Sequence, residues 1–389
     1  MNELVVRIAA RGDGVTSAGR HVPFGVPGDA LLDDGALAFG PHHQPPPCRH
    51  FPECGGCQLQ HADDEAYRGY LVSRIETALG QHALTTEIRD PHLSPPKARR
   101  RAILRALKAG QRVQLGFNAA KSHRIVDMRE CHILRPELFA LIDPLRRMLG
   151  MVLPPKRSAE IHLTLVDQGP DVLLKGVGAD GLAAIERLTA FAADHRLARL
   201  STDQGLGPET SFEPHPATVT LSGTRVAFPP GAFLQATADG ESALVDAVRE
   251  AFGGAARTAD LFAGLGTFAI ATGANYAAEA SRDSVAALKR GVPNALVEHR
   301  DLYRRPLDPG ELKDFDAVVL DPPRAGAEQQ ARLLAASAVQ RIAYVSCNPA
   351  TFARDARTLA DGGYRLEWVR PVGQFRWSTH VELAAYFSR

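Results

Sequence analysis

The pattern of hydrophobic and polar positions changes along the chain and divides it into three segments. Residues 1–42 contain short apolar runs separated by turn-forming groups such as RGDG and VPGD, a pattern that indicates a small β module. The proline-rich HHQPPP at 42–47 is typical of a linker. In the mixed segment from 48 to about 230, stretches such as RVQLGF, AEIHLTLVD and DVLLKGV are typical of strands.

From residue 231 on, the pattern predicts alternating strands and helices. GESALVDAVREAF indicates a helix, and TADLFAGLGTFAIA indicates a strand, a glycine-rich turn and a helix. FDAVVLDPP and RIAYVSCNP are apolar strands that end in loops. Repeated βα units predict a mostly parallel sheet covered by helices, and ligands of such sheets bind beyond the carboxyl ends of the strands. We therefore expect the functional residues at that edge.

The bulk composition narrows the class of protein. A chain of 389 residues with 45% hydrophobic content can bury a sizeable core and is long enough for two or three domains. The formal net charge of +1 excludes a uniformly basic nucleic-acid binder, although a local basic face is compatible with it. The N-terminus lacks the apolar run of a signal peptide, and no stretch approaches the roughly 18 apolar residues of a membrane span. We expect a cytosolic protein without membrane contact.

Four of the five cysteines form a candidate metal site. Cys48, Cys54 and Cys57 have the spacing C-x5-C-x2-C, and Cys131 follows in MRECHIL. In a reducing compartment, clustered thiols favour metal binding or catalysis over disulfides. Four thiolates suit tetrahedral zinc or an iron–sulfur cluster, and the spacing alone leaves both open. The alternative is four unrelated buried thiols.

The fifth cysteine, Cys347, lies in YVSCNPATFARD, directly after the apolar strand RIAYV. At the end of a parallel strand, a cysteine is a candidate nucleophile. The structural alternative is a small side chain that packs at the strand end.

The turn DLFAGLGTF is a candidate nucleotide site. Gly264 and Gly266 would let a nucleotide-like ligand approach the backbone. Glu279 follows at the distance expected for an acid that binds ribose hydroxyls, with a solvated helix cap as the alternative. The turn also fits a nicotinamide-binding pattern, but Asp260 occupies a position that is usually apolar there, and no hydride chemistry is evident.

Two further motifs carry charge. Asp321 precedes two prolines and Arg324, and the prolines would hold the carboxylate in an extended loop. Residues 97–112, KARRRAILRALKAGQR, contain seven Lys or Arg and no acid. That run favours a surface that binds the phosphate backbone of RNA. The alternative is a charged face that only contacts solvent.

Taken together, the motifs resemble those of a known family. CRHFPECGGCQLQH with the later REC, then FLQAT, DLFAGLGTF, LDPPRAG, YVSCNP and THVELAAYF, occur in the order found in the S-adenosylmethionine-dependent RNA uridine-5-methyltransferases. The resemblance covers nearly the whole chain and is to the rRNA branch, which combines an N-terminal TRAM domain with an iron–sulfur cluster.

The resemblance implies an α/β fold with a C-terminal Rossmann-like class I methyltransferase domain. This domain would comprise residues 60–90 and 231–389, beside a mixed α/β central domain (43–59 and 91–230) and a shortened TRAM-like module (1–42). It also implies a role for each motif. Cys347 would be the nucleophile and Glu382 the base. A [4Fe-4S] cluster would be held by Cys48, Cys54, Cys57 and Cys131, and S-adenosylmethionine by Gln235, Phe262, Gly264, Glu279, Asp301 and Asp321.

The implied reaction forms 5-methyluridine, with rRNA as the expected partner of a monomeric enzyme. The chain departs from the family pattern at Arg376, where the loop before Glu382 usually has a proline, and in the short N-terminal module. The alternatives are a tRNA uridine as substrate, a non-catalytic RNA-binding protein stabilised by a metal, and a nicotinamide-dependent oxidoreductase.

Overall fold

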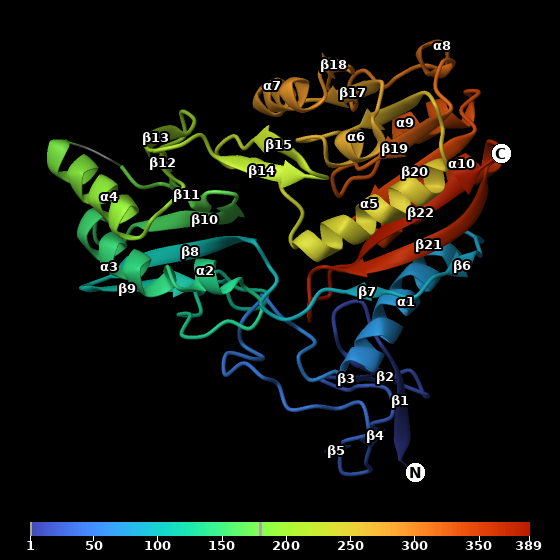
Figure 1. Ribbon diagram of the computed structural model, residues 1–389. Helices are drawn as coiled ribbons and strands as arrows, with labels where there is room; N and C mark the ends of the chain where they lie inside the picture. The colour runs from blue at the N-terminus through green and yellow to red at the C-terminus, as the bar shows by residue number, and fades with distance from the viewer. Residues whose placement is uncertain (1, 179–180) are drawn as a thin grey trace. The chain divides into compact units, whose positions relative to one another are not determined.

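The computed structural model describes residues 2–178 and 181–389, which form two compact units. The first unit comprises Met1–Pro47, Gln58–Ser94 and Asp239–Arg389, and the second comprises Cys48–Cys57 and Pro95–Ala238. Each unit has its own sheets and hydrophobic core (Figure 1). In the described part of the chain, no helix combines the length and the apolar character needed to cross a membrane.

The first unit begins with the predicted β module. Five short strands pair antiparallel in the order β3-β2-β1-β4-β5. Val5, Ile8 and Val15 are buried in this module, while Val6 and Arg7 of β1 are exposed. The strands are β1 (Glu3–Ile8), β2 (Gly14–Thr16), β3 (His21–Val22), β4 (Ala30–Leu31) and β5 (Leu37–Ala38).

The main sheet of the first unit has nine strands, ordered β18-β17-β16-β19-β20-β22-β21-β6, with β7 also paired to β21. The five strands from β18 to β20 are parallel, and β22 is antiparallel to both of its neighbours. The parallel strands are β16 (Thr258–Leu261), β17 (Tyr276–Glu279), β18 (Leu296–His299), β19 (Ala317–Leu320) and β20 (Arg341–Ser346). The remaining strands are β6 (Glu87–Ile88), β7 (His92–Leu93), β21 (Arg365–Gly373) and β22 (Glu382–Ser388).

Helices cover both faces of this sheet, as the apolar strand sequences predict. Val318 and Leu320 of β19 pack in one hydrophobic cluster with residues of α1, α9 and α10, whereas Ala317 and Val319 pack in another with α5. This alternation follows from the period of two along a strand. The helices of this unit are α1 (Asp64–Gly80), α5 (Ala238–Phe252), α6 (Thr267–Thr272), α7 (Arg282–Gly291), α8 (Pro309–Leu312), α9 (Glu328–Ala335) and α10 (Pro349–Asp361). The predicted Rossmann-like fold with an N-terminal β module is confirmed.

The second unit contains a six-stranded sheet in the order β13-β12-β11-β10-β8-β9 and a separate β14-β15 hairpin. Its core combines alternate residues of the sheet with the helices α2 (Pro136–Phe139), α3 (Ile142–Val152) and α4 (Leu182–Asp194). The strands are β8 (Arg101–Ala109), β9 (Arg112–Gly116), β10 (Ser158–Val166), β11 (Gly169–Lys175), β12 (Arg199–Asp203), β13 (Glu209–Phe212), β14 (Thr218–Leu221) and β15 (Thr224–Ala227).

Candidate active site

The register of two antiparallel strands brings Cys347 and Glu382 together. Ser346, the last residue of β20, pairs with Leu383 of β22. Continuing this register by one residue sets Cys347 across from Glu382, the first residue of β22. Directly opposed residues of antiparallel strands have their Cβ atoms about 5 Å apart. The two residues predicted to perform the chemistry are therefore neighbours at the sheet edge predicted to bind ligand.

The surroundings of Cys347 keep its thiol protonated. Burial and, to a smaller extent, the carboxylates of Glu382 and Asp321 raise the pKa of Cys347 to about 11, while the cation of Arg324 lowers it. Asp321 follows β19 directly, and its amide bonds to Leu261 O of β16. Burial, together with the charges of Glu382 and Asp260, raises the pKa of Asp321 well above the ordinary value. Two acidic side chains, Glu382 and Asp321, therefore oppose ionisation of this thiol.

Hydrogen bonds from α10 fix the loop that follows Asp321. Asn348 Nδ2 and Thr351 Oγ1 donate to the carbonyl of Arg324, at 3.0 and 3.2 Å. Asn348 also caps α10 through its side-chain oxygen, which accepts from the Ala350 amide. Cys347, the predicted nucleophile, immediately precedes Asn348 in sequence. Asn348 therefore connects Cys347, the start of α10 and the loop that carries Arg324.

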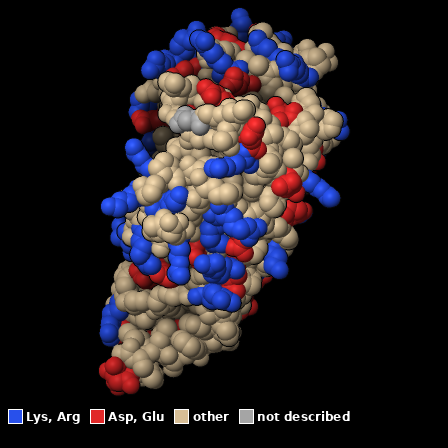
Figure 2. Space-filling view, turned by 90° about the vertical axis from the view of Figure 1, so that its left-hand side faces the viewer, with Lys and Arg blue, Asp and Glu red and all other residues tan. Residues whose placement is uncertain are grey.

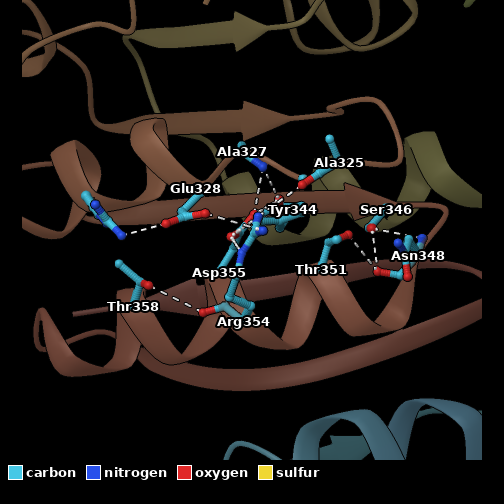
Figure 3. A network of polar contacts seen from close by, with 12 residues as sticks. Ala325, Ala327, Glu328, Tyr344, Ser346, Asn348, Thr351, Arg354, Asp355 and Thr358 are labelled. Atoms are coloured by element: carbon cyan, nitrogen blue, oxygen red, sulfur yellow. Dashed lines mark hydrogen bonds and ion pairs between the residues drawn. The ribbon is translucent and has the colours of Figure 1, made fainter. Parts of the chain in front are cut away.

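A buried pair holds the far end of the same loop (Figure 3). Asp355 is fully buried, and its Oδ2 accepts from Tyr344 Oη at 2.6 Å and from the Ala327 amide at 2.7 Å. Arg354 donates to Asp355 Oδ1 and to Ala325 O. The sequence analysis missed this network, because no spacing pattern joins a tyrosine in a strand to an aspartate one helix later.

The predicted nucleotide turn adopts the expected strand–turn–helix geometry. Glu279 Oε2 accepts from the Gly264 amide at 2.9 Å, which holds the acid at the carboxyl ends of β16 and β17. Phe262 has a left-handed backbone, with φ of 66°. A Cβ added at Gly264 would meet nothing within 4 Å, which leaves room for a ligand. At Gly266, in contrast, a Cβ would lie 2.3 Å from Leu288 Cδ1, so this glycine is required for packing against α7.

Asp260, which the predicted site omitted, has the strongest signature of a ligand-binding group at this turn. It is wholly buried, its Oδ2 accepts from the Ala269 amide, and its Oδ1 has no hydrogen-bond partner among the described residues. Burial, with a smaller contribution from Glu279, raises its pKa to about 7. An unpartnered buried carboxylate oxygen is costly unless a ligand satisfies it. The chemistry of this turn therefore fits a cationic nucleoside ligand such as S-adenosylmethionine.

Asp301 lies beyond β18, where its carboxylate accepts from the Tyr303 amide at 3.0 Å. The Tyr303 ring packs on Phe262, with 5.5 Å between ring centroids, and its hydroxyl donates to Gly326 O. Tyr303 thus joins the predicted cofactor residues to the Arg324 loop, and no sequence pattern pointed to this role. Gln235, the remaining predicted cofactor residue, belongs to the second unit and is buried there.

The four other cysteines all belong to the second unit. Burial raises the pKa of Cys54 to about 11, and the nearby thiols of Cys131 and Cys48 add to the rise. The guanidinium of Arg99 lies within electrostatic range of Cys57 and Cys131. These interactions place the four side chains in one region. In the residues that the structure describes, however, no group of three or more His, Cys, Asp or Glu side chains is arranged to hold a metal ion.

The basic run at 97–112 forms the hairpin of β8 and β9, and many of its cations have partners inside the second unit. Arg105 pairs with Glu160 at 2.6 Å, and Lys108 donates to Gly150 O. The Arg101 guanidinium lies 4.4 Å from the centre of the Phe233 ring. Figure 2 shows a face of the molecule on which Lys and Arg lie among Asp and Glu side chains. That residues 97–112 form a surface that binds RNA stays a prediction.

Comparison with known proteins agrees with this site. The C-terminal residues 290–389 match the family model described as tRNA (uracil-5-)-methyltransferase. An uncharacterized RNA methyltransferase of Zymomonas mobilis is 51% identical, with 99% of each chain covered. The 23S rRNA (uracil(1939)-C(5))-methyltransferase RlmD of Shewanella frigidimarina is 32% identical over 88% of this chain and 82% of its own.

Among solved structures, the tRNA (uracil-54, C5)-methyltransferase of Pyrococcus abyssi has the same fold. Its TM-score is 0.76 at 22% identity, with 100% of this chain and 99% of that chain covered. Identity at this level supports the fold, and the more similar sequences support the family. The nicotinamide and non-catalytic alternatives are thereby excluded. The chain belongs to the S-adenosylmethionine-dependent RNA uracil-5-methyltransferase family.

Proposed function

We propose that this enzyme forms 5-methyluridine in large-subunit rRNA, with Cys347 as nucleophile and Glu382 as base. The observation that carries the proposal is the register that opposes these two residues at the carboxyl edge of the sheet. The relative from Shewanella frigidimarina, named as a 23S rRNA methyltransferase, supports the choice of substrate. The cytoplasm is the compartment that this substrate requires.

The reaction begins at the thiol. Carbon 5 of uracil is a weak nucleophile, but addition of the Cys347 thiolate to carbon 6 moves the ring electrons onto the exocyclic oxygen as an enolate. Carbon 5 of this enolate then attacks the methyl group of S-adenosylmethionine, so that a carbon–carbon bond forms and the sulfonium–methyl bond breaks. The target base has to leave its stack to reach the site. Arg324, whose charge lowers the pKa of the Cys347 thiol, would stabilise the thiolate.

Elimination completes the cycle. Glu382 removes the proton from carbon 5, the electron pair re-forms the double bond between carbons 5 and 6, and the Cys347 thiolate leaves. The register that sets Glu382 opposite Cys347 supports this role, because carbon 5 is the neighbour of the carbon that the thiol attacks. We further propose that six residues of the first unit bind the methyl donor: Asp260, Phe262, Gly264, Glu279, Asp301 and Asp321. The role of Gln235 stays a prediction.

The proposal is tested by the Glu382→Ala variant with a uridine-containing rRNA fragment and S-adenosylmethionine. Addition and methyl transfer remain possible without the base, but elimination does not. We expect a methylated protein–RNA adduct that survives denaturing electrophoresis and is absent with Cys347→Ala. Normal turnover by the Glu382→Ala variant would contradict the role of Glu382.

A second candidate substrate is tRNA. The family model and the P. abyssi structure both carry tRNA in their descriptions. Mapping 5-methyluridine in rRNA and tRNA from cells with and without the gene separates the two. Loss of the modification from tRNA alone would replace the rRNA proposal.

We also propose that Cys48, Cys54, Cys57 and Cys131 bind a [4Fe-4S] cluster. Their spacing and their mutual electrostatic interactions support it. Gly55, which lies between Cys54 and Cys57, adds no support for a cluster. Its backbone packs against the protein itself, since a Cβ there would lie 2.7 Å from Asn118 O. Protein purified without oxygen should be brown and contain iron and sulfide, while colourless protein with stoichiometric zinc would contradict the assignment.

A further inference from the structure

The loop between β21 and β22, residues 374–381, leads directly to Glu382 and is unusually buried for a connection. Gln374, Trp377, Ser378 and Val381 are each 5% exposed or less. Trp377 has φ of 59°, in the left-handed region that a bulky residue rarely adopts. Such a conformation persists only where the surroundings enforce it.

Two tyrosines of α1 bind the backbone of this loop. Tyr67 Oη donates to the carbonyls of Phe375 and Ser378, at 3.0 and 3.3 Å. Tyr70 Oη lies 3.1 Å from the carbonyl of Thr379 and 3.3 Å from that of Ala10 in the β module. Both side chains are almost fully buried, and their rings lie parallel with centroids 6.4 Å apart. The Tyr67 hydroxyl therefore binds carbonyls on both sides of the strained Trp377, and the Tyr70 hydroxyl binds a carbonyl that follows it.

The residues directly after Cys57 bind the backbone of the strained Trp377 itself. The amides of Gln58 and Leu59 both donate to Trp377 O, at 2.7 and 2.8 Å. Gln58 Oε1 accepts from the Thr379 amide at 3.2 Å. Three consecutive carbonyls, at residues 377, 378 and 379, thus each accept a hydrogen bond from the N-terminal part of the chain.

Arg376 adds an anchor on the outer side of the loop. Its guanidinium pairs with Asp64 in the first turn of α1 and donates to Ser94 O at 3.1 Å. It also lies 4.8 Å from the ring centre of Trp377. The departure from proline at this position therefore does not loosen the loop, since an ion pair and a backbone hydrogen bond replace the rigidity of the ring.

We propose that Tyr67 and Tyr70 are positioning residues that set the geometry of Glu382 for proton removal. The inference rests on the proposed role of Glu382, and it concerns the elimination step alone. Addition of Cys347 and methyl transfer depend on residues that follow β19 and β20, whereas the tyrosine hydroxyls bond to the loop before Glu382 and to Ala10. A displaced base would therefore slow the release of product from the covalent adduct and leave the earlier steps intact.

The experiment is a single-turnover assay with methyl-labelled S-adenosylmethionine and an RNA fragment that the wild type methylates. Samples are quenched in denaturant, and label in the protein–RNA adduct is separated from label in released RNA. For the full-length Tyr67→Phe and Tyr67→Phe/Tyr70→Phe variants, we expect total methyl transfer within about twofold of wild type. Elimination should slow by about 10- to 100-fold, the range associated with small misplacement of a catalytic group. Labelled adduct should then accumulate.

The matched control is Tyr364→Phe. The Tyr364 hydroxyl also donates to a backbone carbonyl, Val339 O at 2.6 Å, and its loss should lower the melting temperature without raising the adduct fraction. Equal slowing of methyl transfer and elimination in Tyr67→Phe, or no change in either, would overturn the proposal. If Glu382→Ala itself accumulates no adduct, the proposed role of Glu382 as base is contradicted. This result differs from those that would overturn only the proposal for the two tyrosines.

Discussion

The hydroxyl of Tyr344 donates a 2.6 Å hydrogen bond to Asp355, and both side chains are completely buried beneath the active-site loop. Asp355 in turn accepts from the Ala327 amide, so a strand residue and a helix residue together fix the end of the loop that begins at Asp321 (Figure 3). The position of Arg324 relative to Cys347 depends on this contact.

Removing that hydroxyl should therefore reduce both stability and activity. Tyr344→Phe leaves a buried carboxylate oxygen short of a donor, which costs about 1–3 kcal/mol. Methylation should fall by more than the loss of folded protein explains, as measured by denaturant unfolding and by initial rates. Tyr276→Phe is the control, because its hydroxyl bonds to Glu298 at 2.6 Å in the same unit. Equal activity in the two variants would remove the proposed link to the loop.

The reactivity of Cys347 should depend on the acid opposite it. Burial and then Glu382 raise the thiol pKa, which is about 11, so that about one thiol in a thousand is ionised at pH 8. Glu382→Gln removes a negative charge and should increase the rate of iodoacetamide labelling at Cys347 several-fold. Arg324→Gln should lower it. Peptide mass spectrometry measures both rates, and slower labelling in Glu382→Gln would show that the carboxylate does not act on the thiol.

Asp260 should make the ligand-free enzyme less stable as the pH rises. Its pKa is about 7 when folded, against an ordinary value of 3.8, so between these values the folded state binds a proton that the unfolded state lacks. The contribution of this group to stability therefore falls from about pH 4 to about pH 7 and is constant above. The side chain in Asp260→Asn cannot ionise, and the stability advantage of this variant should grow over the same interval to about 4 kcal/mol. Parallel pH profiles of the two proteins would contradict the assignment.

Gly266 and Gly273 offer a matched test of packing at the nucleotide turn. Both have positive φ, 92° and 66°, but only a Cβ at Gly266 meets a neighbour, Leu288 Cδ1 at 2.3 Å. Gly266→Ala should cost the backbone strain plus about 1–3 kcal/mol for overpacking, whereas Gly273→Ala should cost the strain alone. Denaturant midpoints compare the two, and an equal loss would contradict the steric role of Gly266.

The sequence predicted the parallel sheet well, because βα periodicity is local. The strand FDAVVL, the turn after Leu261 and the loop after Ser346 all lie where their patterns place them. The basic run also follows the period of a strand. Ala102, Leu104 and Ala106 bury one side of β8, and Arg101 and Arg105 lie on the other side. That period of two was present in the sequence.

The long-range contacts had no such signal. Tyr67 bonds to Phe375 across 308 residues, and a tyrosine in a helix gives no indication of which carbonyl its hydroxyl will meet. The roles of Cys347 and Glu382 came from the family resemblance, and their apposition became visible only through the register of β20 and β22. Local patterns predict elements, whereas tertiary packing decides which polar groups meet.

The most direct test of the central claim is 5-methyluridine formation on an rRNA fragment by the purified Cys347→Ser variant. The account predicts no product, because a serine alkoxide is not accessible in place of the thiolate and no covalent adduct can form. Methylation at the wild-type rate by that variant would contradict nucleophilic catalysis at position 347.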